Sequence, residues 1–148
     1  MTALIQRFRK EEKGLTLIEL LAVIVIIGII AAIAVPLITG VLNKTKDNAR
    51  VATANQLFEA AKLRSIAKNE GILSGTHSLD NLIKEEYIQD GLTDPRTGQS
   101  FDATGTIVNL EKLNTDDYIV ILSIGGKIEG QYKLSELTKN SETAKDTP

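Results

Sequence analysis

Between Leu20 and Ile38 the chain runs for 19 residues without a charged or strongly polar side chain. Thirteen of these residues are Leu, Ile or Val and four are Ala, and the other two are Gly28 and Pro36. As an α-helix the run reaches about 28 Å, close to the thickness of the hydrocarbon core of a bilayer. A buried core helix rarely needs so long an apolar run without a polar face. The run therefore predicts a helix that spans a membrane.

The segment before the apolar run is basic, whereas the rest of the chain is acidic. Residues 1–14 hold four basic and two acidic side chains, and the remainder holds 13 basic and 17 acidic ones. The positive-inside rule then predicts that the N-terminus stays in the cytoplasm. The mildly acidic remainder argues against nucleic acid as the main partner.

A conventional secretory signal peptide is the competing interpretation of the N-terminus. The basic segment suits it, and Ala32-Ile33-Ala34 supplies a small-residue cleavage site. However, the apolar run is longer than the usual stretch of about 7–15 residues. Pro36 would also be the second residue after the cut, and Glu19 would have no purpose. These features favour a retained helix.

Glu19 is an acidic residue at the very start of the apolar run. Thirteen Leu, Ile and Val residues at about 0.3–0.6 kcal/mol each favour insertion by about 4–8 kcal/mol. A carboxylate at the helix centre costs on the order of 3 kcal/mol, and less near an interface. Insertion into the membrane is therefore favoured, and two interpretations of Glu19 remain. Its carboxylate either reaches the cytoplasmic interface or awaits a positive partner on another molecule.

Residues 13–21 resemble the type IV prepilin signature in their sequence Lys13-Gly14-Leu15-Thr16-Leu17-Ile18-Glu19-Leu20-Leu21. In that family a basic leader ends in Gly, the apolar helix follows at once, and Glu is the fifth residue of the mature chain. Counted from Leu15, Glu19 is the fifth residue and Pro36 is the twenty-second, where many pilins also carry Pro. The usual residue after the cut is Phe, although other apolar residues occur there. The resemblance covers about residues 10–45.

The resemblance implies a structural subunit of a type IV pilus or pseudopilus, and not an enzyme. A prepilin peptidase would recognise the Lys13-Gly14-Leu15 junction, cleave after Gly14 and leave Leu15 to be N-methylated. In the filament the new amine of Leu15 would meet Glu19 of a neighbouring subunit and set the axial register.

The implied partners are other copies of the chain, other pilins or pseudopilins, the peptidase, and an assembly platform with a cytoplasmic ATPase. Any DNA contact would come only through the assembled filament, and no cofactor is expected. The subunit would cross the cytoplasmic membrane once, with its N-terminus inside, and then join a filament at the cell surface. Motility or adhesion pili, competence pili and type II secretion pseudopili remain open. A conventionally secreted or membrane-anchored monomeric binding domain is the alternative function.

Pro36 lies inside the expected membrane helix. It lacks an N–H and crowds the carbonyl group four residues earlier, so a kink or a locally unwound stretch is expected between Gly28 and Pro36. Membrane helices tolerate Pro, which is one interpretation. The other, implied by the resemblance, is a hinge at Gly28 and Pro36 that lets subunits extend within the filament.

The helical pattern continues from residue 39 to about Glu70, with Gly71 as a plausible stop. Apolar side chains recur there at spacings of three and four, as in Val51, Ala54, Leu57, Phe58 and Ala61. The predicted polar face holds Lys44, Lys46, Asp47, Arg50, Lys62 and Lys68.

The remainder predicts a small antiparallel sheet of about three strands. After a loop at residues 72–76, Ser78 is expected to cap a short helix with Leu79, Leu82 and Ile83 on one face. The β-rich segments are residues 106–110, 118–124 and 127–134, with a hairpin turn at Gly125-Gly126. In the last of them the face expected to be buried holds Ile128, Gly130, Tyr132 and Leu134.

The predicted fold is therefore α+β and pilin-like, with a long N-terminal helix packed against a small antiparallel sheet. Its predicted segments are a leader at 1–14, a membrane and polymerisation helix at 15–42, and an external domain at 43–134. Residues 135–148 are almost devoid of apolar side chains and are expected to form a disordered tail.

The sequence contains no recognisable catalytic or metal-binding set of residues. It has no cysteine, which excludes disulfides and thiolate chemistry. His77 is its one histidine and is expected in a surface loop. A calcium loop is a minor alternative, although the spacing of an EF-hand is absent. Its candidate ligands are Asp94, Asp102, Asp116 and Asp117.

Overall fold

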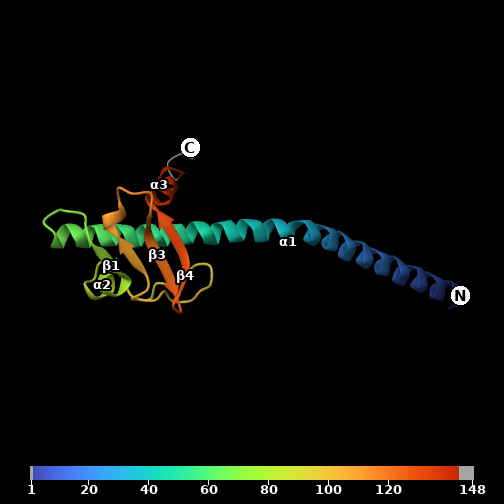
Figure 1. Cartoon of the computed structure of the whole chain (residues 1–148). Helices are drawn as coiled ribbons and strands as arrows, with labels where there is room; N and C mark the ends of the chain where they lie inside the picture. Colours follow the sequence, from blue (N-terminus) through green and yellow to red (C-terminus); the bar gives the residue numbers. More distant parts are fainter. Residues whose placement is uncertain (1, 144–148) are drawn as a thin grey trace. The chain divides into compact units, whose positions relative to one another are not determined.

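The computed structural model describes the backbone of residues 2–143 and the side chains of residues 16–138. Its longest element is helix α1, Thr2–Lys68, which precedes a small antiparallel sheet (Figure 1). The fold is α+β and pilin-like, as the sequence predicts. The chain forms two compact units, one ending at Leu42 and one beginning at Asn43, and α1 contributes residues to both.

The first unit consists of helix α1 alone. The backbone stays α-helical through Gly28 and Pro36, so the locally unwound stretch is not present in this helix. One turn after the proline, the Thr39 hydroxyl donates to the carbonyl oxygen of Val35 at 2.9 Å. Such a bond to the carbonyl four residues earlier is typical of bent helices. The hinge itself stays a prediction.

The second unit is built on four antiparallel strands in the order β1-β2-β3-β4. They are β1 (Thr76–Ser78), β2 (Ile107–Asn109), β3 (Tyr118–Ile124) and β4 (Lys127–Lys133). The last three were expected. The three-residue strand β1 was not, because so short a segment has no visible alternation of polar and apolar residues.

The hairpin between β3 and β4 turns at Gly125 and Gly126, as predicted. Both have positive φ angles, +57° and +76°, which glycine adopts without steric cost. The Asp102 carboxylate accepts their backbone N–H groups at 3.0 and 2.7 Å, and the Ser123 hydroxyl at 2.9 Å. The hydrogen bonds from Gly126 and then Ser123 lower the pKa of Asp102.

The core lies between the second half of α1 and the sheet. Ala54, Leu57, Phe58 and Ala61 are all buried, which confirms the helical spacing predicted from the sequence. They belong to one apolar cluster with the buried residues of the sheet and of the segments around it. The other members of that cluster are Ala60, Leu79, Leu82, Ile88, Phe101, Val108, Leu110, Ile119, Val120, Leu122, Ile124 and Leu137.

Of the two further helices, α2 agrees with the sequence prediction and α3 does not. Helix α2, Leu79–Lys84, begins as predicted, with the Ser78 hydroxyl accepting the N–H of Asn81 at 3.3 Å. Helix α3, Leu134–Thr143, corrects the expectation of a disordered tail from residue 135. Leu137 is only 1% exposed because it joins the core, and the partly buried Leu134 packs against the same cluster. Residues 144–148 lie outside the part of the chain that the structure describes. A 3₁₀ turn, η1, spans Leu110–Lys112.

Strand β4 does not bury the face that strict alternation predicts. Ile128 is 60% exposed. Pairing slips between the partners Leu122↔Gly130 and Ser123↔Ile128, so the strand carries an extra residue there. A bulge of this kind reorients the following side chains, which explains why the period of two fails. Leu134 is not in the strand, because it begins α3.

Candidate functional site

The first unit exposes an unusually large apolar surface. From Leu17 to Leu42, seventeen Leu, Ile and Val side chains are each more than half exposed. The helix is long and apolar enough to cross a membrane, and its most apolar stretch has no buried residue. Monomeric soluble proteins rarely leave such a contiguous apolar surface in water. Lipid or another protein surface must therefore cover this segment.

Glu19 is the one acidic residue on this apolar stretch of α1. It is exposed, as are its neighbours Leu17, Ile18, Leu20 and Leu21. Within residues 16–138 no basic side chain forms an ion pair with it. A carboxylate in apolar surroundings is expensive unless a cation accompanies it. The described part of the chain therefore leaves Glu19 open to a partner from elsewhere.

The other residues singled out in the sequence also lie on α1. Lys13, Gly14 and Leu15 are helical in their backbone, and the side chains of Lys13 and Leu15 lie outside the described part. At Gly28 a β-carbon would meet nothing within 4 Å, so packing inside the chain does not demand a glycine. A small residue on an exposed membrane helix does let a second helix approach closely.

The N-terminal residues also match a known family pattern. The prokaryotic N-terminal methylation motif matches residues 9–35, a stretch that includes Gly14, Leu15 and Glu19. The chain carries the type IV pilin and pseudopilin signature. No solved structure matches the chain. The type IV pilin family is structural and not enzymatic, and the apolar helix together with this signature is consistent with a membrane-anchored pilin.

The second unit, which begins at Asn43 and is called the external unit below because of its expected position, is held together near its first residues by a buried ion pair. Arg50 is 5% exposed, which corrects its assignment to the polar face of the helix. Its Nε donates to Asp94 Oδ1 at 2.7 Å, and its Nη2 donates to Asp94 Oδ2. Its Nη1 donates to the carbonyl oxygen of Glu129 at 3.0 Å. One side chain of α1 thus binds both Asp94 and strand β4.

Asp94 orders the turn at residues 94–98, in which the Gly98 N–H donates to the Asp94 carbonyl oxygen at 2.7 Å. Its carboxylate accepts the Thr97 hydroxyl at 2.8 Å and the backbone N–H groups of Arg96 and Thr97 at 3.3 and 3.2 Å. The guanidinium of Arg50 is the largest cause that lowers the pKa of Asp94, to about 2, in spite of its burial. Asp94 is therefore ionised at neutral pH and compensates the buried charge of Arg50.

The four aspartates proposed as calcium ligands are each bound to other groups. Asp94 pairs with Arg50, and Asp102 closes the β3–β4 hairpin. Asp116 pairs with Lys133 at 2.9 Å, and Asp117 with Lys112. In the described residues no three acidic or histidine side chains lie together in a way that suits a metal. The structure therefore gives the calcium alternative no support.

His77 is buried, which corrects the expectation of a surface loop. It lies in strand β1 and is 4% exposed. Its Nδ1 lies 2.7 Å from Nη1 of Arg64, and its Nε2 lies 3.1 Å from the carbonyl oxygen of Ser74. An arginine can only donate and a carbonyl can only accept, so the ring is neutral and carries its proton on Nε2.

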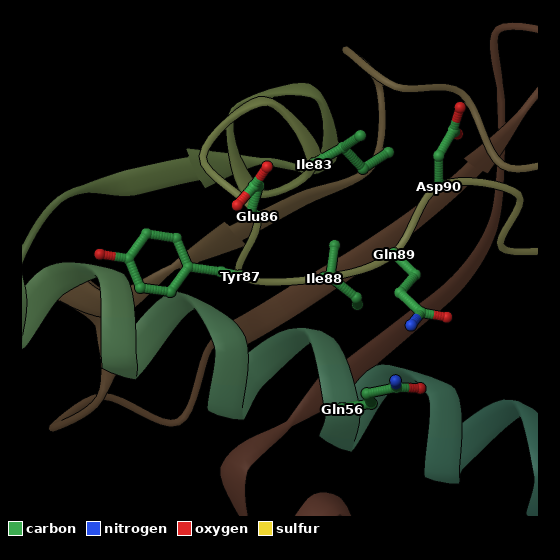
Figure 2. A pocket seen from close by; sticks show the side chains of 7 residues that line it. All are labelled: Gln56, Ile83, Glu86, Tyr87, Ile88, Gln89 and Asp90. Atoms are coloured by element: carbon green, nitrogen blue, oxygen red, sulfur yellow. The ribbon is translucent and has the colours of Figure 1, made fainter.

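An open groove on the external unit lies between α1 and the segment after α2. Figure 2 shows Gln56 of α1 facing the stretch from Glu86 to Asp90. The groove is lined by Gln56, Ile83, Glu86, Tyr87, Ile88, Gln89 and Asp90. Four of its polar lining residues are exposed, namely Gln56, Glu86, Gln89 and Asp90. Among the described side chains no buried polar atom lacks a hydrogen-bond partner, so nothing marks the groove as a ligand site.

Proposed function

We propose that this chain is a prepilin, the precursor of a structural subunit that polymerises into a type IV pilus or pseudopilus. The observation that carries the proposal is the apolar stretch of α1, which buries nothing against the described part of the chain. Such a surface is stable in lipid and equally stable against other helices of the same kind. A subunit that moves from a membrane into a filament needs a helix with both properties.

Processing would begin at the junction of Gly14 and Leu15. Glycine has no side chain, so a peptidase can approach the backbone closely. The basic leader of residues 1–14 would remain in the cytoplasm, and residues 15–42 would form the membrane and polymerisation helix. The division of the chain after Leu42 supports an external domain that begins at residue 43.

The cut would supply the positive charge that Glu19 lacks. An α-amine is protonated near neutral pH, because its ordinary pKa is about 8. The amine of Leu15 on one subunit would pair with the Glu19 carboxylate of a neighbour. Each charge is costly alone in an apolar bundle, and each offsets the other when they meet. The pair would therefore favour one axial stagger over all others.

The remaining roles follow from the same arrangement. Gly28 and Pro36 would form the flexible part of the helix, since Pro36 removes one backbone hydrogen bond. The prepilin peptidase, other pilins or pseudopilins, and an assembly platform with its cytoplasmic ATPase would be the partners. Any contact with DNA would come through the assembled filament.

Electron microscopy of sheared surface material tests this function. We expect thin filaments that contain this chain, and we expect them to be absent when its gene is deleted. Recovery of the chain only as a membrane-bound monomer would support the anchored binding domain instead. Recovery only as a dispersed protein in the medium would support conventional secretion after the Ala32-Ile33-Ala34 site.

A further inference from the structure

A buried histidine lies where the end of α1, strand β1 and the segment after α2 meet. The His77 ring accepts a hydrogen bond from Arg64 of α1 at Nδ1 and donates one to the carbonyl of Ser74 at Nε2. Arg64 is itself held by Glu85, through Nε at 3.0 Å and Nη2 at 2.7 Å. Lys68 reaches the same carboxylate at 2.7 Å.

We propose that His77 is an acid-sensitive latch, which fastens residues 69–78 to the end of α1 and opens when its imidazole is protonated. The inference stands on the contacts of the external unit and does not depend on the proposed function. The latch joins three segments that the backbone pairing alone holds weakly, because β1 has only three residues.

Protonation breaks the latch for a geometric reason. A second proton must go to Nδ1, the atom that accepts from Nη1 of Arg64 at 2.7 Å. Arginine stays protonated at any pH a protein meets, so two donors and two positive charges would then face each other. The contact between His77 and Arg64 must therefore be lost.

The charged groups around the ring do not compensate the positive charge of a protonated imidazole. Within the described residues, the charged groups around the ring are Arg64 and Lys68 from α1 and Glu85 after α2. From β2, the partner of His77 is the buried apolar Val108. The Glu85 carboxylate already binds both cations, and they hold its pKa at about 2. Glu85 therefore stays ionised, but its two oxygens already accept three donors from Arg64 and Lys68, which compensate its negative charge.

The direction of the pH dependence follows from burial. Burial is the largest cause that lowers the pKa of His77 below its ordinary value of 6.5, and Arg64 lowers it further. The folded unit therefore binds this proton less readily than the unfolded chain does. The stabilising effect is complete above about pH 6.5 and is lost as the pH falls through the lower folded-state pKa.

The segment released by acid is well defined. Ser65, which is fully buried, donates its hydroxyl to the carbonyls of Ile72 and Ser74 at 2.9 and 3.0 Å and accepts the N–H of Ser74 at 2.9 Å. These bonds and the His77 latch hold residues 69–76 on α1, together with the backbone bonds from Asn69 N to Ser65 O at 2.8 Å and from Gly71 N to Ile66 O at 3.1 Å. Protonation leaves the Nε2–H bond to the Ser74 carbonyl in place but removes the contact of the ring with Arg64, so the loop loses its side-chain link to this part of α1 and loosens.

Hydrogen exchange of the full-length chain in detergent micelles tests the latch. Between about pH 7.5 and about pH 5, and after correction for the intrinsic rates, we expect the protection of residues 69–78 to fall several-fold. Strand β3 should keep its protection. Because the chain has one histidine, a single imidazole signal in NMR reports the pKa, which we expect below 6.5.

Two variants separate a titrating latch from a merely structural residue. His77→Gln keeps an acceptor for Arg64 and a donor for Ser74 but cannot titrate, so its loop should stay protected at both pH values. Arg64→Gln removes the cation at Nδ1 and should raise the pKa of His77. The inference is overturned if His77→Gln loosens in acid as the wild type does. It is also overturned if His77 titrates at 6.5 or above with unchanged loop protection.

Discussion

Replacing Asp94 with Ala should lower the free energy of unfolding of the external domain by about 3–5 kcal/mol. The reason is the charge left behind, because the Arg50 side chain is 6% exposed and would keep only the partly exposed Glu129 carboxylate, at 4.0 Å, as an anion beside it. Thr97 would also lose the acceptor that orders the 94–98 turn. Urea unfolding of the full-length chain in detergent micelles measures the loss. The tyrosine bands of the near-ultraviolet circular dichroism report the external domain alone, because Tyr87, Tyr118 and Tyr132 all lie in it.

Two control variants show whether the buried charge is the cause. Asp116→Ala removes an acid from an ion pair whose carboxylate is 88% exposed, so it should cost less than about 1 kcal/mol. Joint replacement of Arg50 by Met and Asp94 by Leu removes both charges and should destabilise less than Asp94→Ala does. An Asp94→Ala variant as stable as Asp116→Ala would contradict the role given to this ion pair.

The same ion pair predicts an acid-labile contribution to stability. The pKa of Asp94 falls from 3.8 to about 2 in the folded unit. A lowered pKa means that the unfolded chain binds the proton first, so the contribution is present above about pH 3.8. It is lost as the pH falls towards about 2. The Asp94→Ala variant should lack this part of the acid dependence.

Replacing Glu19 with Gln should abolish or strongly reduce filament formation while leaving the chain in the membrane. Removing one member of a buried pair costs about 3 kcal/mol, which is roughly a hundredfold in the association constant of a subunit contact. Gln keeps the size of the side chain and makes membrane insertion easier, since the charge is gone. The number of filaments in sheared material measures the first effect. The amount of the chain in the membrane fraction measures the second.

Glu59→Gln is the matched control for this experiment. Glu59 is also an exposed acid on α1, but it pairs with Lys62 at 3.0 Å in the external unit. Its replacement should leave filament number within about twofold of the wild type, because an exposed pair contributes little. Normal filaments with unchanged stagger in Glu19→Gln would contradict the pairing of Glu19 with a terminal amine.

Features with a strong local signal could be predicted from the sequence. The apolar run, the 3–4 spacing of Ala54, Leu57, Phe58 and Ala61, and the Gly125-Gly126 turn each depend on residues close together in the chain. Helix α1 also ends where expected, with Lys68 as its last residue and φ of +90° at Gly71. These elements follow from periodicity and turn chemistry alone.

Features that depend on distant partners could not be predicted. Arg50 has the spacing of a solvated residue, and its burial depends on Asp94, 44 residues later. His77 looks like a loop residue until Arg64 supplies its partner. Helix α3 has one buried apolar side chain, Leu137, too little to be distinguished from a polar tail. In each case a tertiary contact overrides the local pattern.

The assembly residues show a different limit. Glu19 was singled out because an acid at the start of an apolar run is costly, and the structure leaves its carboxylate exposed and unpaired among residues 16–138. Its proposed partner lies on another molecule, so a single chain cannot contain the pair. The roles of Lys13, Gly14, Leu15, Gly28 and Pro36 likewise stay predictions.

The intact mass of the subunit from purified filaments tests the central claim most directly. The account predicts a chain that begins at Leu15 and carries one added methyl group on its terminal amine. That result would place a positive charge four residues before Glu19, where the pairing requires it. A filament subunit that still begins at Met1, with its basic leader attached, or one that begins at Val35, would contradict the account.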